Sequence, residues 1–68
     1  MKLLTERETA DLLRVAPATL RVWRHYGKGP SYFRLEKAIR YSQEDVQNWL
    51  KRCMVLPQSE KEVNKYAS

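Results

Sequence analysis

The sequence predicts a small α+β domain in which two short helices precede a β-hairpin and a third helix. Three observations carry this prediction: a helical apolar period in residues 6–26, a period of two in residues 32–41, and a second helical period after Ser42. Glycine and proline separate these segments. The chain has 68 residues, enough for one domain with a thin core, because so short a chain buries only about 60% of the surface of its unfolded form.

The first helix is predicted over residues 6–13. Thr5 and Glu8 have the spacing of a capping box, and Leu4 precedes them as a staple residue. The helix then carries one apolar stripe, formed by Thr9, Ala10, Leu12 and Leu13.

A second helix is predicted from Pro17 to Tyr26, after a short connection at residues 14–15. Proline suits the first turn of a helix, where its missing N–H has no intrahelical partner, and Gly27 is a natural stop. Two short helices joined by a turn of a few residues, in a basic protein, indicate a helix-turn-helix.

Residues 28–30 (Lys-Gly-Pro) break the helix, and alternating residues then predict a hairpin. With a three-residue turn at residues 36–38, Leu35 faces Ile39 and Phe33 faces Tyr41, so that these four apolar side chains share one face. Arg34 and Arg40 then share the other face. A two-residue turn would instead set Arg40 opposite Phe33 and split the apolar set, so side-chain alternation favours the longer turn.

Ser42 is expected to cap the third helix, with Asp45 three residues later. The helix should end before Pro57. Its apolar face is predicted to consist of Val46, Trp49, Leu50 and Cys53. The domain therefore covers residues 1–56, and residues 57–68 form a C-terminal tail that is mobile or ordered by a partner, with Ser59 and Glu62 as the only sign of a further short helix.

The charge is concentrated in one stretch. The net charge is +5, and residues 21–40 hold six basic residues against Glu36 alone, which accounts for all of it. A localised basic stretch is typical of a surface that binds a polyanion. The alternative interpretation is that these residues form an ordinary solvated face that keeps the protein soluble.

Other classes of protein are disfavoured. One histidine and one cysteine cannot close a zinc site, and no catalytic triad, paired carboxylates or glycine-rich phosphate loop is recognisable, so we expect no enzyme, cofactor, metal or small-molecule substrate. Cys53 has no disulfide partner, and no apolar run approaches the ~18 residues that span a membrane. With no signal peptide recognisable, the expectation is a cytoplasmic protein.

Residues 4–50 resemble the excisionase-type winged helix-turn-helix, which is related to the first domain of MerR-like regulators. The resemblance is carried by Leu4-Thr5, Ala10, Leu12-Leu13, Val15, Thr19-Leu20, Trp23, residues 27–30, Arg34-Leu35, Ile39-Arg40-Tyr41, Glu44-Asp45-Val46 and Trp49-Leu50. Three positions depart from the family: Arg14 and Glu36 replace glycines, and Ala16 replaces a capping serine. A non-glycine residue in a left-handed turn costs roughly 1 kcal/mol, and a lost helix cap about as much.

In the helix-turn-helix geometry that the resemblance implies, the second helix enters the major groove of DNA. Leu20 and Trp23 would point to the core, leaving a DNA-binding face and a flank of this helix formed by Ala18, Arg21, Val22, Arg24, His25 and, just beyond it, Lys28. Small Ala18 and Val22 would allow close approach to a thymine methyl, and Arg21 is the best candidate for a bidentate contact to guanine. The alternative interpretation is that these arginines only keep the exposed face of the helix soluble.

The resemblance places the hairpin as a wing against the adjacent minor groove. Lys37 lies at its tip, and Arg34 and Arg40 on its strands would read groove shape and potential. Arg40 has an alternative, an ion pair with Asp45 or Glu44. The aromatic residues Tyr32, Tyr41, Trp23 and Trp49 are expected in the core rather than stacked on bases.

The resemblance implies a recombination directionality factor that binds tandem sites on double-stranded DNA, with neighbouring copies of itself, and bends them. The bend would let a tyrosine integrase excise a prophage in a bacterial host. Two alternatives stay open: a small winged-helix transcription regulator, and a protein-interaction accessory module that does not bind DNA.

Overall fold

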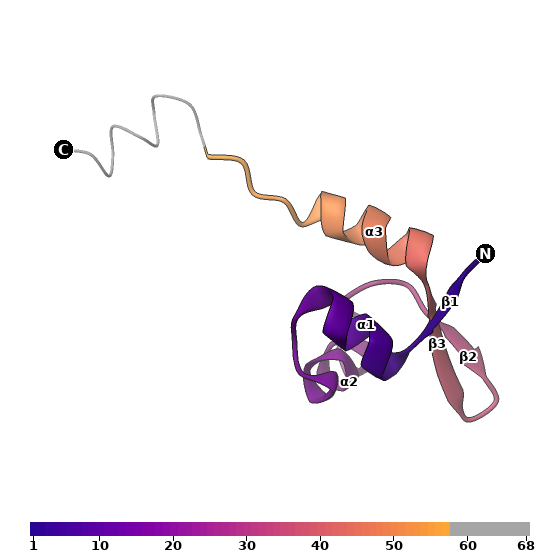
Figure 1. Ribbon diagram of the computed structural model, residues 1–68. Helices are drawn as coiled ribbons and strands as arrows, with labels where there is room; N and C mark the ends of the chain where they lie inside the picture. The colour runs from indigo at the N-terminus through magenta and orange to yellow at the C-terminus, as the bar shows by residue number, and fades with distance from the viewer. Residues whose placement is uncertain (58–68) are drawn as a thin grey trace.

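The computed structural model describes residues 1–57 and forms an antiparallel sheet with helices packed on one of its faces (Figure 1). The elements in chain order are β1 (Leu3–Thr5), α1 (Glu6–Leu13), α2 (Pro17–His25), β2 (Phe33–Leu35), β3 (Ala38–Ser42) and α3 (Gln43–Arg52). This arrangement confirms the predicted α+β winged helix-turn-helix. The expectations for the tail after Pro57 lie outside the residues that the structure describes.

The capping box at the start of α1 is confirmed. The Glu8 N–H donates to Thr5 Oγ1 over 3.0 Å, and the Thr5 N–H donates to Glu8 Oε1 over 2.8 Å. Thr9 is buried, and its hydroxyl is satisfied by the Thr5 carbonyl at 2.8 Å. Local sequence therefore determines where this helix begins.

The turn between α1 and α2 has the strain that its missing glycine implies. Arg14 takes the left-handed conformation, with φ 61° and ψ 40°, as the C-cap of α1. Ala16 begins α2 in extended geometry without a side-chain cap, and Pro17 occupies the first turn. The helix ends at His25, one residue earlier than expected.

The sheet contains a strand that the sequence did not predict. β1 pairs antiparallel with β3, with Leu4 opposite Tyr41, and the strand order is β1-β3-β2. A segment of three residues shows no alternation, so only its pairing with β3 reveals it as a strand.

The predicted three-residue turn of the hairpin is wrong. Phe33 pairs with Arg40 and Leu35 with Ala38, which leaves a two-residue turn at Glu36 and Lys37. Glu36 has a left-handed φ of 57°, the kind of backbone conformation that a two-residue hairpin turn demands.

The shorter turn splits the apolar residues of the hairpin between two faces. Ile39 and Tyr41 face the helices, whereas Phe33 and Leu35 lie on the opposite face, where they are 39% and 49% exposed. The alternating residues therefore predicted the wrong turn, because not every apolar side chain of the hairpin reaches the core. Helices cover only one face of the sheet. The pairing of β1 with β3 puts Leu4 beside Tyr41 on that covered face.

The core lies between that covered face and the helices. Its buried side chains are Leu4, Ala10, Leu20, Tyr41 and Val46, with Leu13, Val15, Trp23, Tyr32 and Ile39 packed at its edge. Trp23 and Trp49 contact each other with ring centroids 5.5 Å apart, which joins α2 to α3. Tyr41 lies in the core and Trp23 and Tyr32 pack at its edge, as expected, whereas the partly exposed Trp49 contacts Trp23 at that edge.

α3 contacts the rest of the domain through the buried Val46 and through Trp49. Ser42 caps it as predicted, accepting from the Asp45 N–H at 3.4 Å, and Val46 is buried. Leu50 and Cys53 are exposed, which corrects the predicted apolar face, because α3 extends beyond the other helices (Figure 1). The helix also ends at Arg52, well before Pro57. Within residues 1–57, no helix has the length and apolar character needed to cross a bilayer.

Candidate nucleic-acid interface

The face of α2 opposite the core is open to solvent. Leu20 is fully buried and Trp23 is half-buried, so the helical phase predicted from the sequence is correct. The side chains exposed on the other side are Ala18, Arg21, Val22 and His25. The His25 ring meets the exposed Tyr26 ring edge-on, with centroids 4.9 Å apart. This face combines small, cationic and ring side chains without an acidic residue of its own helix.

Arg21 is held by an acidic residue of the preceding helix. Its Nη1 donates to Glu6 Oε1 over 2.8 Å, although the Arg21 side chain is 58% exposed. Glu6 was not among the site residues expected from the sequence. Its partners lie 15 and 18 positions further along the chain, and only the packing of α1 on α2 brings them together.

Arg24 lies inside the domain. Its side chain is only 15% exposed, and its Nη1 donates to Glu6 Oε2 at 2.7 Å and to the Tyr41 hydroxyl at 3.0 Å. Burial by itself lowers the pKa of Arg24, but the hydrogen bonds to Tyr41 and Glu6 outweigh it and hold that pKa above its usual value. A DNA contact by Arg24 stays a prediction, since the described structure uses its guanidinium to join α1, α2 and β3.

Tyr32 connects α2 to the hairpin. The guanidinium carbons of Arg24 and Arg34 lie 5.7 and 5.9 Å from the centroid of its ring, within cation–π distance. The Tyr32 ring also packs 6.0 Å from the Tyr41 ring. Arg34 therefore belongs to the face of the hairpin that meets the helices.

The cations of the hairpin do not form the single row that the sequence predicted. Because Arg34 pairs with Ile39 and Arg40 pairs with Phe33, the two arginines lie on opposite faces, which corrects the expected shared face. Arg40 donates from Nη1 to the Ile39 carbonyl at 2.8 Å, and within residues 1–57 it makes no ion pair with Asp45 or Glu44. Lys37 is exposed at the tip.

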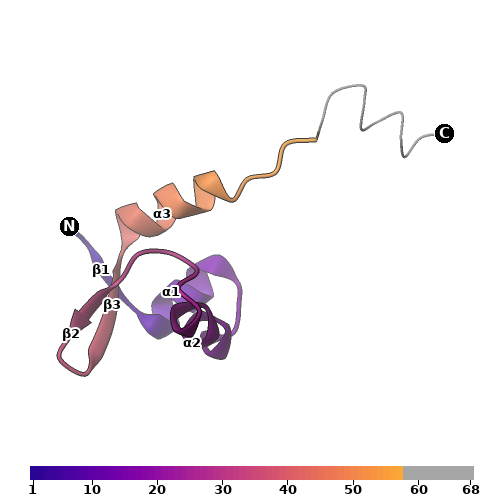
Figure 2. The same cartoon turned by 180° about the vertical axis from the view of Figure 1, so that it is seen from behind.

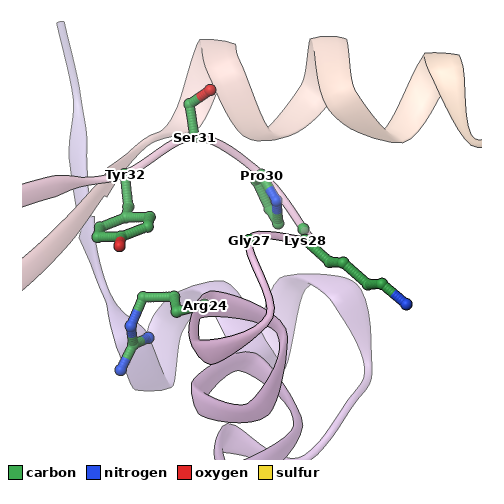
Figure 3. A pocket seen from close by; sticks show the side chains of 7 residues that line it. Arg24, Gly27, Lys28, Pro30, Ser31 and Tyr32 are labelled. Atoms are coloured by element: carbon green, nitrogen blue, oxygen red, sulfur yellow. The ribbon is translucent and has the colours of Figure 1, made fainter.

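A shallow pocket of about 350 Å³ lies where α2 turns into the segment leading to β2 (Figure 3). It is lined by Arg24, Gly27, Lys28, Gly29, Pro30, Ser31 and Tyr32. The Lys28 side chain points away from the others, toward solvent (Figure 3). The part of the chain that the structure describes contains no group of three His, Cys, Asp or Glu side chains able to hold a metal ion.

α2 and the tip of the hairpin lie on the same side of the domain, opposite α3 (Figures 1 and 2). Arg21, Arg34 and Lys37 are all exposed. A rod-like polyanion placed against α2 would therefore meet the hairpin next to it. This combination of an open helix face and an adjacent cationic hairpin is the geometry of a groove-binding helix with a wing.

No curated protein and no solved structure matches the chain significantly. A family model described as a helix-turn-helix domain matches residues 3–54. The match begins with β1 and ends just after α3, so it covers every helix and strand of the described structure. The chain therefore belongs to the helix-turn-helix domain family, which includes excisionase-like DNA-binding proteins and indicates sequence-specific DNA binding.

Proposed function

We propose that the protein is an excisionase, a recombination directionality factor that binds and bends DNA so that a tyrosine integrase excises a prophage. The observation that carries the DNA-binding part is the exposed face of α2, a helix without an acidic residue of its own, beside a cationic hairpin. The excision role is supported by the resemblance of residues 4–50 and by a family that includes excisionase-like proteins. In this proposal the protein acts in the cytoplasm of a bacterial host, on its DNA.

α2 is the helix that enters the major groove in this proposal. Ala18 and Val22 are small enough for close approach, Arg21 contacts guanine, and His25 reaches a base or a phosphate. At the uncapped N-terminus of α2, Pro17 has no N–H and the Thr19 N–H donates to the Ala16 carbonyl at 2.9 Å, which leaves the Ala18 N–H for a DNA phosphate.

The hairpin and the loop before it hold the DNA backbone. Lys28, Arg34 and Lys37 are exposed cations placed for phosphates and the minor groove. Arg40 contributes less directly in this scheme, since it lies on the far face of the hairpin and is partly covered.

Tandem binding follows from the small size of the domain. A single copy offers few base contacts, and bending a site by 40–90° costs on the order of 1–6 kcal/mol, so neighbouring copies must share that cost. We infer a monomer in solution that binds adjacent sites cooperatively, and an integrase as the further partner.

The salt dependence of DNA binding tests the electrostatic surface. If about 4–6 phosphates are neutralised, log affinity falls with log salt at a slope of about −4 to −5. Electrophoretic titration on random duplex DNA at several salt concentrations measures the slope. A slope near zero favours a protein-interaction module over a DNA-binding protein.

Two substitutions separate base contacts from backbone contacts. Arg21→Ala should cost about 1–3 kcal/mol on preferred DNA and relax the preference at one base pair. Lys37→Ala should weaken binding to all DNA sequences equally and reduce the slope of log affinity against log salt by about one. Intact affinity and preference in Arg21→Ala would show that α2 does not read bases as proposed.

An excision assay tests the biological role. A plasmid carrying the two recombined attachment sites is incubated with integrase, with and without this protein. Excision that depends on the protein supports the proposal. DNA binding without any effect on excision favours a transcription regulator instead.

A further inference from the structure

We propose that Glu6 is a specificity-determining positioning residue of the DNA interface. Its carboxylate holds Arg21 in place to read a base, and its negative charge lowers affinity for DNA of any sequence. This inference rests on the proposed function, since it assigns a role to the residue that fixes the main base-reading side chain.

Glu6 links Arg21 to the buried part of the domain. One carboxylate oxygen accepts from Arg21 at 2.8 Å, and the other accepts from Arg24 at 2.7 Å. Arg24 is fixed in turn by the hydroxyl of Tyr41, a fully buried side chain. The exposed Arg21 is therefore connected by three successive polar contacts to the core.

This anchoring leaves most of Arg21 free for DNA. A guanidinium has five N–H donors in a planar fork, and the contact with Glu6 uses Nη1. The remaining donors keep the paired geometry that guanine recognition requires. A side chain that is already ordered loses less conformational entropy when it binds, so the contact with the correct base gains affinity.

The same carboxylate opposes DNA binding in general. It lies 2.8 Å from the Arg21 guanidinium, so a phosphate near Arg21 is within the screening length of about 8 Å at physiological salt. Removing this charge strengthens binding to any sequence, whereas losing the anchor weakens binding to the preferred one. The two effects have opposite signs, which a purely structural role does not produce.

The test compares Glu6→Gln with Asp11→Asn. Asp11 is an exposed acidic residue of the same helix and makes no ion pair within residues 1–57, so its substitution removes an equal charge without touching Arg21. The probes are a random-sequence duplex pool and the duplex that wild-type protein enriches from that pool. Thermal unfolding by circular dichroism establishes that each variant is folded.

We expect Glu6→Gln to bind the random pool about two- to fivefold more tightly and to lose at least about fivefold in the ratio of selected to random affinity. Asp11→Asn should leave that ratio unchanged. In an Arg21→Ala background, Glu6→Gln should no longer change the ratio. Glu6→Asp keeps the charge but has a shorter side chain, so it should lower the ratio of selected to random affinity without increasing the affinity for the random pool. This variant is used for the test if Glu6→Gln does not fold.

Three outcomes overturn the inference: a ratio in Glu6→Gln equal to that of Asp11→Asn, an equal weakening of both DNAs, or a ratio change that persists without Arg21. Failure of the proposed function itself looks different. In that case the wild-type protein enriches no duplex from the pool.

Discussion

The close approach of Gly29 to Trp23 allows a sharp test of how the loop after α2 packs. Gly29 has a φ of 88°, and a Cβ added there would lie 3.1 Å from Trp23 Cε3 and 3.2 Å from Trp23 Cβ. The Trp23 ring cannot easily retreat, because the Trp49 ring packs 5.5 Å from it. Gly29→Ala therefore combines a left-handed backbone cost of about 1–2 kcal/mol with an overpacking cost of about 1–3 kcal/mol.

Gly27 provides a matched control in the same loop. It has a φ of 68°, but a Cβ added there meets nothing within 4 Å. Gly27→Ala should therefore lose only the backbone part, about 1–2 kcal/mol. The difference between the two variants isolates the contact with Trp23 at about 1–3 kcal/mol, or roughly 5–20 °C in Tm for a domain of this size.

Urea unfolding of the wild type and both variants measures these differences. Tryptophan fluorescence reports on the Trp23–Trp49 pair, and far-ultraviolet circular dichroism reports on the helices. Equal destabilisation by the two substitutions would refute the close packing of residue 29 on Trp23. A Gly29→Ala protein as stable as the wild type would refute the left-handed conformation as well.

Five further substitutions, which form three tests, probe other parts of the fold by thermal unfolding. Ala16→Ser should stabilise the protein by about 0.5–1 kcal/mol, because Ala16 caps α2 in suitable geometry without a side-chain acceptor; no gain would mean that α2 begins elsewhere. Glu36→Gly should gain up to about 1 kcal/mol by relieving the left-handed φ of 57°, whereas Glu36→Ala, with the same charge change, should not. Trp49→Ala should lower the free energy of unfolding by about 2–3 kcal/mol, because it removes the contact with Trp23. Leu50→Ala should lower it by less than about 1 kcal/mol, because Leu50 is half exposed. Equal losses of stability in the two variants would contradict the packing of α3.

Local chemistry explains why the helices could be located from the sequence. The capping box of Thr5 and Glu8, the first-turn Pro17 and the Ser42 cap each act within a few residues, so their effect does not depend on the rest of the fold. The phase of α2 was equally local. Once Leu20 faces the core, the period of the helix exposes Ala18, Arg21, Val22 and His25.

Part of the candidate site depended on contacts between distant residues. The sequence predicted Arg21 and Arg24 as cations available to DNA. The packing of α1 on α2 instead pairs both with Glu6 and brings Arg24 to the Tyr41 hydroxyl inside the domain. No local pattern marks Glu6 as their partner, because its position at the start of α1 already has an ordinary explanation in the helix dipole.

The sequence by itself determined the order of the three helices and the hairpin, the limits of α1, nearly all of α2, and the concentration of positive charge between residues 21 and 40. Only the tertiary structure decided that Leu3–Thr5 is a strand, that the hairpin turns at two residues, and that α3 leaves Leu50 uncovered. The physical reason is the range of the interactions. Caps and helical phase are set by neighbours along the chain, whereas strand register and burial are set by whichever distant segment covers a face.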